Sequence, residues 1–209
     1  MAKENRLFQF DEKMAGPFES GFAGIDEAGR GPLAGPVVAA AVIFRRRVPL
    51  SGLDDSKRVL PSVRERLFKQ ILSHALVGVA AVSERVIDEI NILEATRLAM
   101  CEAVLSLPHT PSLLLIDGPI RLDLPIKQMS IIGGDGRSAR IAAASIVAKV
   151  WRDHQMQFWD SVYPGYDFAV HKGYATPGHL KILERKGSSE IHRKSFSPVR
   201  VLEKGESRE

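Results

Sequence analysis

Four acidic residues stand at the ends of three apolar runs, and their side chains are of the type that binds hard metal ions. The run GFAGI ends in Asp26 and Glu27, LLLI ends in Asp117, and MSIIGG ends in Asp135. Acids at the ends of buried strands gather at the sheet edge where open α/β sheets bind ligands. One acid before glycine is usually a turn former or a helix cap. Several together repel one another unless a cation neutralises them, so the pattern predicts a cation site.

The available ligand types narrow the choice of metal. The single Cys101 and the absence of an HExxH-type histidine pair exclude an internal disulfide and the common zinc sites. Carboxylate oxygens favour Mg²⁺ or Mn²⁺. Two such ions, roughly 4 Å apart, would orient an attacking water and stabilise the leaving oxygen of a phosphodiester. The acids therefore indicate metal-dependent hydrolysis.

The adjacency of Asp26 and Glu27 raises a geometric problem. Successive side chains of a regular strand point to opposite faces of the sheet. Both acids can reach one site only if the strand ends or bulges there, and Gly29 favours an ending. We therefore expect Asp26 to be the central ligand and Glu27 to reach in from a turn.

The glycine-rich segment after these acids, GRGPLA over 29–34, formally fits the GxGxxA form of the dinucleotide fingerprint. That fingerprint requires a helix to begin there. Pro32, Gly35 and Pro36 interrupt the segment instead, and the strand-like run VVAAAVIF follows. Two interpretations remain: a tight connection between strands, or a turn whose backbone amides are open to a close ligand beside Arg30.

The alternation of apolar runs and helical periodicity predicts an α/β fold. Five runs have strand character, over 18–25, 37–44, 76–82, 112–118 and 126–136. Helical periodicity covers 60–75, 83–107 with an interruption near Asn91, 138–162 and 180–187. Ser62 and Glu65 predict a capping box for the first of these helices. The order predicts a mixed central sheet, antiparallel early and parallel later, flanked by helices and followed by a C-terminal helical segment.

Composition is that of one globular domain over residues 1–209, with 44% hydrophobic and 26% charged residues. The ends, about 1–17 and 201–209, are polar enough to be loosely ordered. No apolar run reaches the roughly 18 residues that span a bilayer, and the N-terminus lacks a signal-peptide core. These features favour a cytoplasmic protein without a membrane partner.

The charge is compatible with a nucleic-acid partner but does not demand one. The formal net charge is +4, and cations outnumber acids between Lys172 and Arg200. From charge alone, that stretch is either a solvated basic tail, with His179 and His192 in it, or a phosphate-binding surface. His154 is expected on a helix face or in the core.

Five segments, taken in order over about residues 18–200, resemble bacterial ribonuclease HII. They are GIDEAGRGPLAGPVV, DDSK, LLLIDG, AAASIVAKVWRD and YPGYDFAVHKGYATPGH. The resemblance implies a ribonuclease H-like fold and an endonuclease that uses Mn²⁺ or Mg²⁺, with two ions per site. Its substrates would be RNA–DNA hybrids and DNA duplexes carrying a single ribonucleotide. Cleavage on the 5′ side of that ribonucleotide would leave 3′-hydroxyl and 5′-phosphate ends.

The resemblance also implies roles for individual residues. Its catalytic and metal-binding acids fall on Asp26, Glu27, Asp117 and Asp135. Its junction-reading Gly-Arg-Gly falls on Gly29, Arg30 and Gly31, and its substrate-sensing tyrosine on Tyr174. Glycine amides can approach a ribose closely, and a tyrosine can stack on a sugar and supply a hydroxyl. Where the family often has lysine before the fourth acid, this chain has Gly133 and Gly134.

Several cations near these segments are candidates for phosphate contacts. They are Lys57, Lys149, Arg152, His171 and Lys172. Each is equally a charge on a helix face or a local hydrogen-bonding group. We expect a monomer, and the C-terminal RVLEKGESRE carries no clear sliding-clamp-binding peptide.

Two other functions fit the residues less well. A junction resolvase of the same fold would share the acids but cut branched DNA. A non-catalytic binding module would use the basic segment and bind hybrid with or without Mg²⁺. Uncompensated carboxylates would repel phosphate, which argues against the binding module.

Overall fold

Five short apolar segments form a mixed sheet at the centre of the chain. The computed structural model describes residues 3–16 and 21–203. The strands are β1 (Phe22–Ala28), β2 (Val37–Phe44), β3 (Ala75–Val82), β4 (Leu113–Asp117) and β5 (Lys127–Ile131), in the order β3-β2-β1-β4-β5. β1, β2 and β3 pair antiparallel, whereas β4 and β5 add to β1 in parallel. The sequence-based prediction of an early antiparallel and a later parallel part is confirmed.

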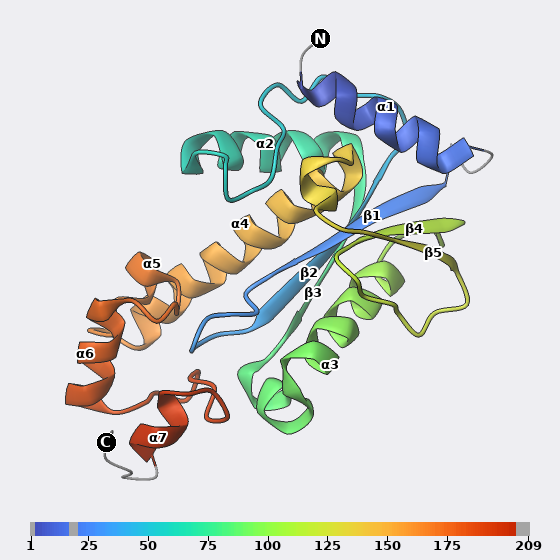
Figure 1. Cartoon of the computed structure of the whole chain (residues 1–209). Helices are drawn as coiled ribbons and strands as arrows, with labels where there is room; N and C mark the ends of the chain where they lie inside the picture. The colour runs from blue at the N-terminus through green and yellow to red at the C-terminus, as the bar shows by residue number, and fades with distance from the viewer. Residues whose placement is uncertain (1–2, 17–20, 204–209) are drawn as a thin grey trace.

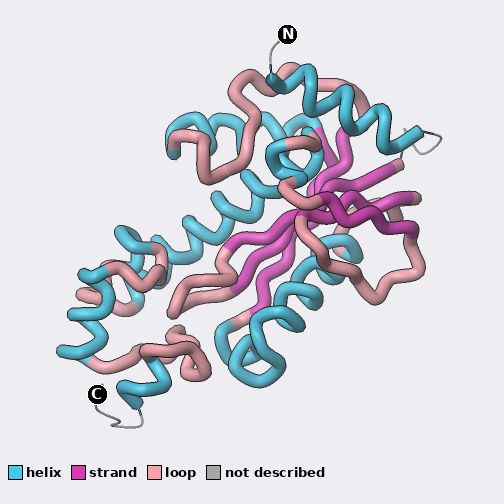
Figure 2. The backbone as a smooth tube through the Cα atoms, in the orientation of Figure 1, coloured by secondary structure: helices cyan, strands magenta, loops and turns pink. Residues whose placement is uncertain are grey.

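Helices cover both faces of this sheet (Figures 1 and 2). Those with bounds described are α1 (Lys3–Ala15), α2 (Pro61–His74), α3 (Glu84–Leu105), the 3-10 turn η2 (Gly134–Gly136), α4 (Ala139–Val162), α5 (Phe168–His171), α6 (Pro177–Lys186) and α7 (Val199–Glu203). Figure 1 shows α4 and α2 on one side of the sheet, α3 on the other, and α5, α6 and α7 gathered beyond one end of the strands. None of the described helices combines the length and apolar character needed to cross a membrane.

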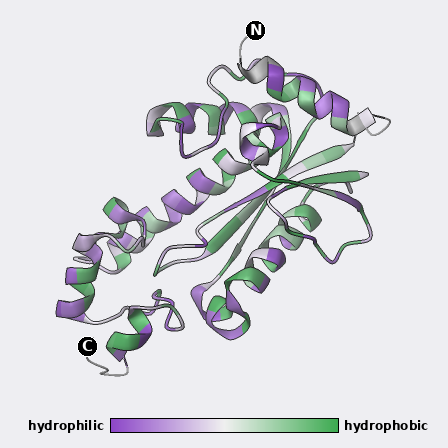
Figure 3. Cartoon of the chain, in the orientation of Figure 1, coloured by the Kyte–Doolittle hydropathy of each residue, from purple (hydrophilic) through white to green (hydrophobic). Residues whose placement is uncertain are grey.

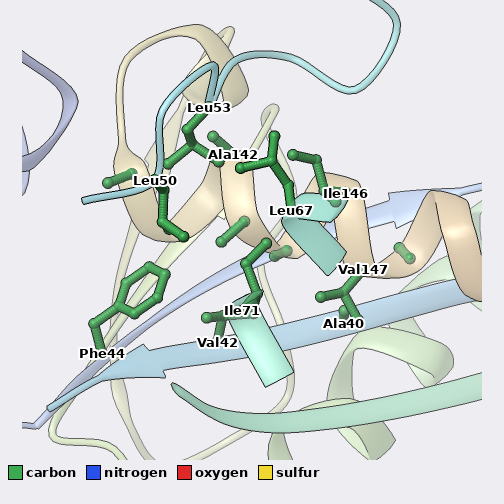
Figure 4. Packing of buried hydrophobic residues seen from close by; sticks show 14 of the residues in the cluster. Ala40, Val42, Phe44, Leu50, Leu53, Leu67, Ile71, Ala142, Ile146 and Val147 are labelled. Carbon is green, nitrogen blue, oxygen red and sulfur yellow. The ribbon is translucent and has the colours of Figure 1, made fainter. Parts of the chain in front are cut away.

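The strand β2 shows how the sequence builds two cores. All eight of its residues are buried. Val38, Ala40, Val42 and Phe44 pack with α2 and α4, and the alternate residues pack with α3. Figure 4 labels Ala40, Val42 and Phe44 in this packing. Since strand side chains alternate between faces, an unbroken apolar run is expected where both faces are covered. The strand β2 is correspondingly coloured as hydrophobic in Figure 3.

Helix α4 lies unusually close to β1. A Cβ built on Gly24 would be 2.3 Å from the carbonyl carbon of Arg140, so only glycine fits at this crossing. Ser138 caps the helix by accepting from the amide of Ile141. The close contact carries the middle of α4, including Ser145, past the strand that bears Asp26.

Helix α3 contains the interruption that the sequence predicts. Ser83 caps its start, and Asn91 has φ 69° and ψ 165°, which are not helical values. The side chain of Asn91 accepts hydrogen bonds from the amides of Leu93 and Glu94. It therefore caps a second helical segment, and the predicted break near Asn91 is confirmed.

The structure differs from two predictions about the helices. The capping box of Ser62 and Glu65 is not formed, because the N-cap of α2 is Leu60, two residues before Ser62, and Pro61 lies in the first turn. The N-terminal segment, for which no element was predicted, contains α1 over residues 3–15, with Leu7 and Phe8 buried in the core.

A buried ion pair fixes α1 in place. Asp11 accepts from Nη1 of Arg140 at 3.2 Å and from its backbone amide at 3.1 Å. Because this segment is polar overall, its narrow apolar stripe did not lead to the prediction of a helix. At the other end, α7 reaches Glu203, so part of the segment 201–209 is also helical. Residues 18–20, predicted as strand, and 204–209 lie outside the described residues.

Candidate active site

Asp26 and Glu27 lie side by side in a regular part of β1. The strand stays paired with β2 through Ala28, with Asp26 opposite Ala40 and Glu27 opposite Ala39. The prediction that the strand ends or bulges at the acids is therefore wrong. Because opposite residues of an antiparallel pair share a face, Asp26 lies on the α4 side of the sheet and Glu27 on the α3 side.

The other edge of β1 explains how both acids are accessible to one site. Pairing between β1 and β4 ends at Ile25 and Ile116, one residue before Asp26. Beyond that point β1 continues without its parallel neighbour, so the edge is open on this side. Acids from the two faces can meet there, around the edge rather than on one face.

The third and fourth acids follow neighbouring parallel strands. Asp117 is the last residue of β4, and its Oδ1 accepts from the amide of Gly134 at 2.6 Å. Asp135 lies in η2, one residue further, and accepts from the amide of Gly136 at 2.8 Å. The carboxyl ends of adjacent parallel strands thus bring the predicted acids to one edge of the sheet, as the sequence analysis expects.

The surroundings of Asp26, Glu27 and Asp135 disfavour the charged form of each carboxyl. Burial raises the pKa of Asp26 well above its usual value, and Glu27 and Asp117 raise it further, whereas a hydrogen bond with Ser145 lowers it. Burial also raises the pKa of Glu27, with Arg30 opposing it. The pKa of Asp135 is raised by burial and by the nearby carboxylates of Asp55 and Asp117. A bound cation would relieve this repulsion.

The donor set fits a hard divalent cation in chemistry but is not gathered around one point. Within residues 3–16 and 21–203, no three His, Cys, Asp or Glu side chains are placed as ligands of a single ion. Mg²⁺ commonly takes only one or two carboxylates and completes its shell with water and substrate phosphate. Carboxylates are the ligand type that this mode of binding uses.

Arg193 holds the glycine-rich turn from the protein interior. Its side chain is fully buried and donates to the carbonyls of Gly29, Arg30 and Gly35 at 2.6–3.0 Å. Burial lowers the pKa of Arg193 to about 9, with a further contribution from Arg152. With its carbonyls directed inward, the turn is rigidly attached to the C-terminal segment.

Arg152, which belongs to α4, also holds the glycine-rich turn through backbone carbonyls. It is fully buried and donates to the carbonyls of Pro36, Lys172 and Ala34 at 2.9–3.0 Å. Burial lowers its pKa to about 10. The sequence predicted a phosphate contact for Arg152. In the structure its guanidinium instead donates to backbone carbonyls inside the protein.

The two glycines of the turn differ in their surroundings. Gly29 has φ +99°, and a Cβ there would lie 2.2 Å from Nε of Arg152. At Gly31, a Cβ would meet only Cε1 of Tyr174, at 4.0 Å. The protein interior therefore requires glycine at 29, whereas at 31 the space is open toward solvent and Tyr174.

A cavity of about 500 Å³ joins Glu27 to this turn. Its lining includes Glu27, Arg30, Gly31, Lys57, Ser145, Lys149 and Tyr174. Tyr174 is 41% exposed rather than buried, so packing alone does not account for its ring. The cavity brings together acidic, cationic and aromatic groups predicted from segments far apart in the sequence.

The other candidates for phosphate contacts differ in their exposure and in their hydrogen-bond partners. Lys57 is exposed in the cavity, and Nζ of Lys149 lies 2.6 Å from Oδ1 of Asp153. Lys172 is half-buried and donates to the carbonyl of Asp153 at 3.5 Å. His171 is buried, with Nε2 bonded to the carbonyl of Tyr166 and Nδ1 to the amide of Gly173. The structure does not place His171 where the predicted phosphate contact would need it.

Sequence reasoning missed residues that support the acids. Ser145 hydrogen-bonds Asp26, and its Oγ lies 2.9 Å from Oγ of Ser56. Asp55 lies close enough to raise the pKa of Asp135. Ser56 and Asp55 belong to the DDSK segment, and Ser145 to AAASIVAKVWRD. Those segments carried the signal, but nothing in them indicated which residues would face the acids.

A family model decides the classification. The model described as ribonuclease HII matches residues 23–199, which contain all four acids and the glycine-rich turn. The chain belongs to the ribonuclease HII family. It is accordingly a nuclease of the ribonuclease H class, type HII.

Solved structures agree with this assignment of fold. The ribonuclease H2 of Pyrococcus horikoshii OT3 has a TM-score of 0.75 at 24% identity, covering 88% of this chain and 97% of that one. Ribonuclease HII of Archaeoglobus fulgidus, solved in a complex with PCNA, has a TM-score of 0.73 at 26% identity, covering 87% and 96%. Bst-RNase HIII in complex with Mn²⁺ has a TM-score of 0.68 at 16% identity, covering 97% and 72%.

Proposed function

We propose that this ribonuclease HII cleaves RNA in RNA–DNA hybrids and cuts on the 5′ side of single ribonucleotides embedded in duplex DNA. Two divalent ions would be used, and the products would carry 3′-hydroxyl and 5′-phosphate ends. The observation that carries the proposal is the single cavity in which Glu27, Gly31 and Tyr174 lie together. One of the four acids, Glu27, thus adjoins an open corner that could test a sugar.

The acids would hold the metal ions. The four carboxylates, whose charges influence one another, would supply the oxygen ligands that Mg²⁺ and Mn²⁺ prefer. The Mn²⁺ complex of the structurally similar Bst-RNase HIII supports a divalent ion. When bound, the ions would supply a nucleophilic water near neutral pH and charge stabilisation for the leaving oxygen.

The protein side chains would prepare the acids for this role. The hydrogen bond from Ser145 favours the charged form of Asp26, and the amide of Gly134 donates to Oδ1 of Asp117. Ser56 lies against Ser145 and so restricts its rotamer. These contacts hold the carboxylates oriented before an ion or substrate arrives.

The corner between Gly31 and Tyr174 would distinguish ribose from deoxyribose. A 2′-hydroxyl both donates and accepts, and backbone groups can reach it only where no side chain intervenes. The open space at Gly31 and the exposed ring of Tyr174 meet this requirement. Arg152 and Arg193 would act indirectly by fixing the turn that carries Gly29, Arg30 and Gly31.

Phosphate contacts would come from the cations that face the cavity. Lys57 and Lys149 line it, and Arg30 is exposed at its rim with Nη1 3.5 Å from Glu27. Lysine and arginine side chains supply most of the electrostatic affinity for nucleic acid. Lys172 lies further back, beside Asp153, and would add to the field rather than contact the backbone.

Cleavage mapping tests the proposal. A labelled DNA duplex carrying one ribonucleotide, an RNA–DNA hybrid, an all-DNA duplex and a branched DNA are each incubated with Mg²⁺, Mn²⁺ or chelator. We expect cleavage of the first two only, with metal only, and on the 5′ side of the embedded ribonucleotide. Cleavage of the branched DNA would support a resolvase instead, and binding without cleavage would support a non-catalytic module.

A further inference from the structure

Three histidines form a buried stack next to Tyr174. His179 and His192 are 0% and 1% exposed, and His171 is 8% exposed. The rings of His171 and His179 are nearly parallel, with centroids 3.9 Å apart. The sequence suggested a place in a basic tail for His179 and His192, but the fold buries both around Phe168.

The hydrogen bonds determine which nitrogen carries the proton on two of these rings. The backbone amide of Ser189 can only donate, and it lies 2.8 Å from Nδ1 of His192, so that nitrogen accepts. The proton of neutral His192 is then on Nε2, which lies 3.0 Å from Nε2 of His179. His179 accepts there and carries its own proton on Nδ1. That proton points to the carbonyl of Tyr174, 2.9 Å away.

His171 is fixed by the same reasoning. The amide of Gly173 donates to its Nδ1 at 3.1 Å, so its proton is on Nε2 and is donated to the carbonyl of Tyr166 at 2.6 Å. The carbonyl of Gly173 in turn accepts from the amide of Leu33 at 2.8 Å. The segment before Tyr174 is therefore held between the histidine stack and the glycine-rich turn.

We propose that His179 and His192 are positioning residues for Tyr174, acting through a directed chain of hydrogen bonds that runs from Ser189 to the carbonyl of Tyr174. The ring of Tyr174 is exposed, so its position depends on its backbone. Its amide donates to the carbonyl of His171, and its carbonyl accepts from Thr176 and His179. The inference rests on the proposed function, in which Tyr174 contacts the sugar.

The surroundings keep the chain of hydrogen bonds neutral. Burial lowers the pKa of His179 to about 4 and of His192 to about 3, and each is lowered further by a neighbouring histidine. The carboxylates that act on the stack, Asp160 and Asp167, act on His171, and they oppose the larger effect of its burial. The directed arrangement therefore persists over the neutral and mildly acidic range.

Nitrogen-15 NMR of the imidazoles tests the hydrogen-bond chain without reference to activity. Between pH 8 and about 5.5, His192 should show a proton on Nε2 only and His179 a proton on Nδ1 only, with neither ring titrating near pH 6.5. His154, which is exposed and paired with Glu65, provides the internal comparison. The opposite tautomer on His179, or titration of His192 near pH 6.5, would overturn the inference.

Kinetics on the single-ribonucleotide duplex test the positioning role. His179→Leu removes the donor to Tyr174 and should raise KM about tenfold, with kcat within about twofold. His179→Asn places an amide N–H near the Nδ1 position and should stay within about twofold of the parent. His154→Asn is the matched control and should behave as the parent. Equal losses in His179→Leu and His179→Asn would contradict the role.

A double variant separates this inference from the proposed function. If His179 acts through Tyr174, His179→Leu should add nothing to the loss caused by Tyr174→Ala. Tyr174→Ala without effect would remove Tyr174 from the proposed function, with the NMR result still standing. Tyr174→Ala impaired and His179→Leu unimpaired would overturn the positioning role alone. Should His179→Leu fail to fold, His192→Asn, which lacks the Nε2 proton, must raise KM.

Discussion

A side-chain carbon on Gly29 would lie 2.2 Å from Nε of Arg152, in the position that the guanidinium occupies. The same turn leaves Gly31 open, with only Tyr174 at 4.0 Å. One glycine thus serves the architecture of the turn, and the other leaves space at the surface of the cavity. The two can be separated experimentally because their substitutions should affect different properties.

Gly29→Ala should destabilise the protein, and Gly31→Ala should impair cleavage without destabilising it. The first combines a clash with a positive φ and should cost about 2–4 kcal/mol of unfolding free energy. The second should change stability by less than about 0.5 kcal/mol but lower kcat/KM on an embedded ribonucleotide about tenfold. Denaturant melts and steady-state kinetics measure both. Gly178→Ala, in the first turn of α6, is the control.

Arg193→Met should be among the most destabilising single substitutions. It leaves the carbonyls of Gly29, Arg30 and Gly35 without their buried donor, at a cost of about 3–5 kcal/mol in unfolding free energy. Arg97→Met removes a surface ion pair with Glu94 and should cost less than about 1 kcal/mol. Comparable losses in the two variants would refute the role given to Arg193.

Asp26→Asn should abolish cleavage and yet stabilise the metal-free protein. The pKa of Asp26 is raised in the folded chain, so the folded state binds this proton more tightly than the unfolded state. Ionisation therefore costs stability as pH rises above the usual aspartate range, and asparagine removes that cost. Thermal melts in chelator should show a Tm about 3 °C higher than the parent.

Metal addition gives the complementary result for Asp26→Asn. Mn²⁺ should raise the Tm of the parent chain and have much less effect on Asp26→Asn, because an ion that binds only the folded state stabilises it. Asp123→Asn, which changes an exposed carboxylate in the loop before β5, is the control and should keep both activity and the response to metal. A parental rate in Asp26→Asn would refute the assignment of the site.

The buried histidines should make the fold acid-sensitive. Their folded pKa values, about 4 for His179 and about 3 for His192, lie below the usual 6.5, so the unfolded state takes up protons first. The free energy of unfolding should keep the full contribution of these neutral histidines above pH 6.5. Below pH 6.5 it should fall by up to about 1.4 kcal/mol per pH unit for each histidine. Denaturant melts at pH 7.5 and 5 measure the fall, and His179→Asn should reduce it.

Much of the fold followed from the sequence because its signals are local. The apolar runs at 37–44 and 112–118 predicted strands, and Asn91 marked the break in α3. Helix α1 escaped prediction because its burial depends on the pairing of Asp11 with Arg140, 129 residues away. Similarly, the start of α2 is set by Pro61 rather than by the polar pair that resembled a capping box.

The candidate site was predictable in its residues but not in its geometry. The residue types and their place before glycines indicated the acids, and the structure brings them to one sheet edge. That Asp26 and Glu27 remain in a regular strand depends on where β4 stops pairing with β1, which no local pattern reports. The buried roles of Arg152 and His171 depend on backbone carbonyls and amides contributed by other segments.

The most direct test of the whole account is the position and chemistry of the cut at a single ribonucleotide in a labelled DNA duplex. With Mn²⁺ or Mg²⁺, the account predicts one cut on the 5′ side of that nucleotide, a 3′-hydroxyl and a 5′-phosphate, and no cut in Asp26→Asn. Cleavage on the 3′ side with a cyclic phosphate, or cleavage that persists in chelator, would contradict it.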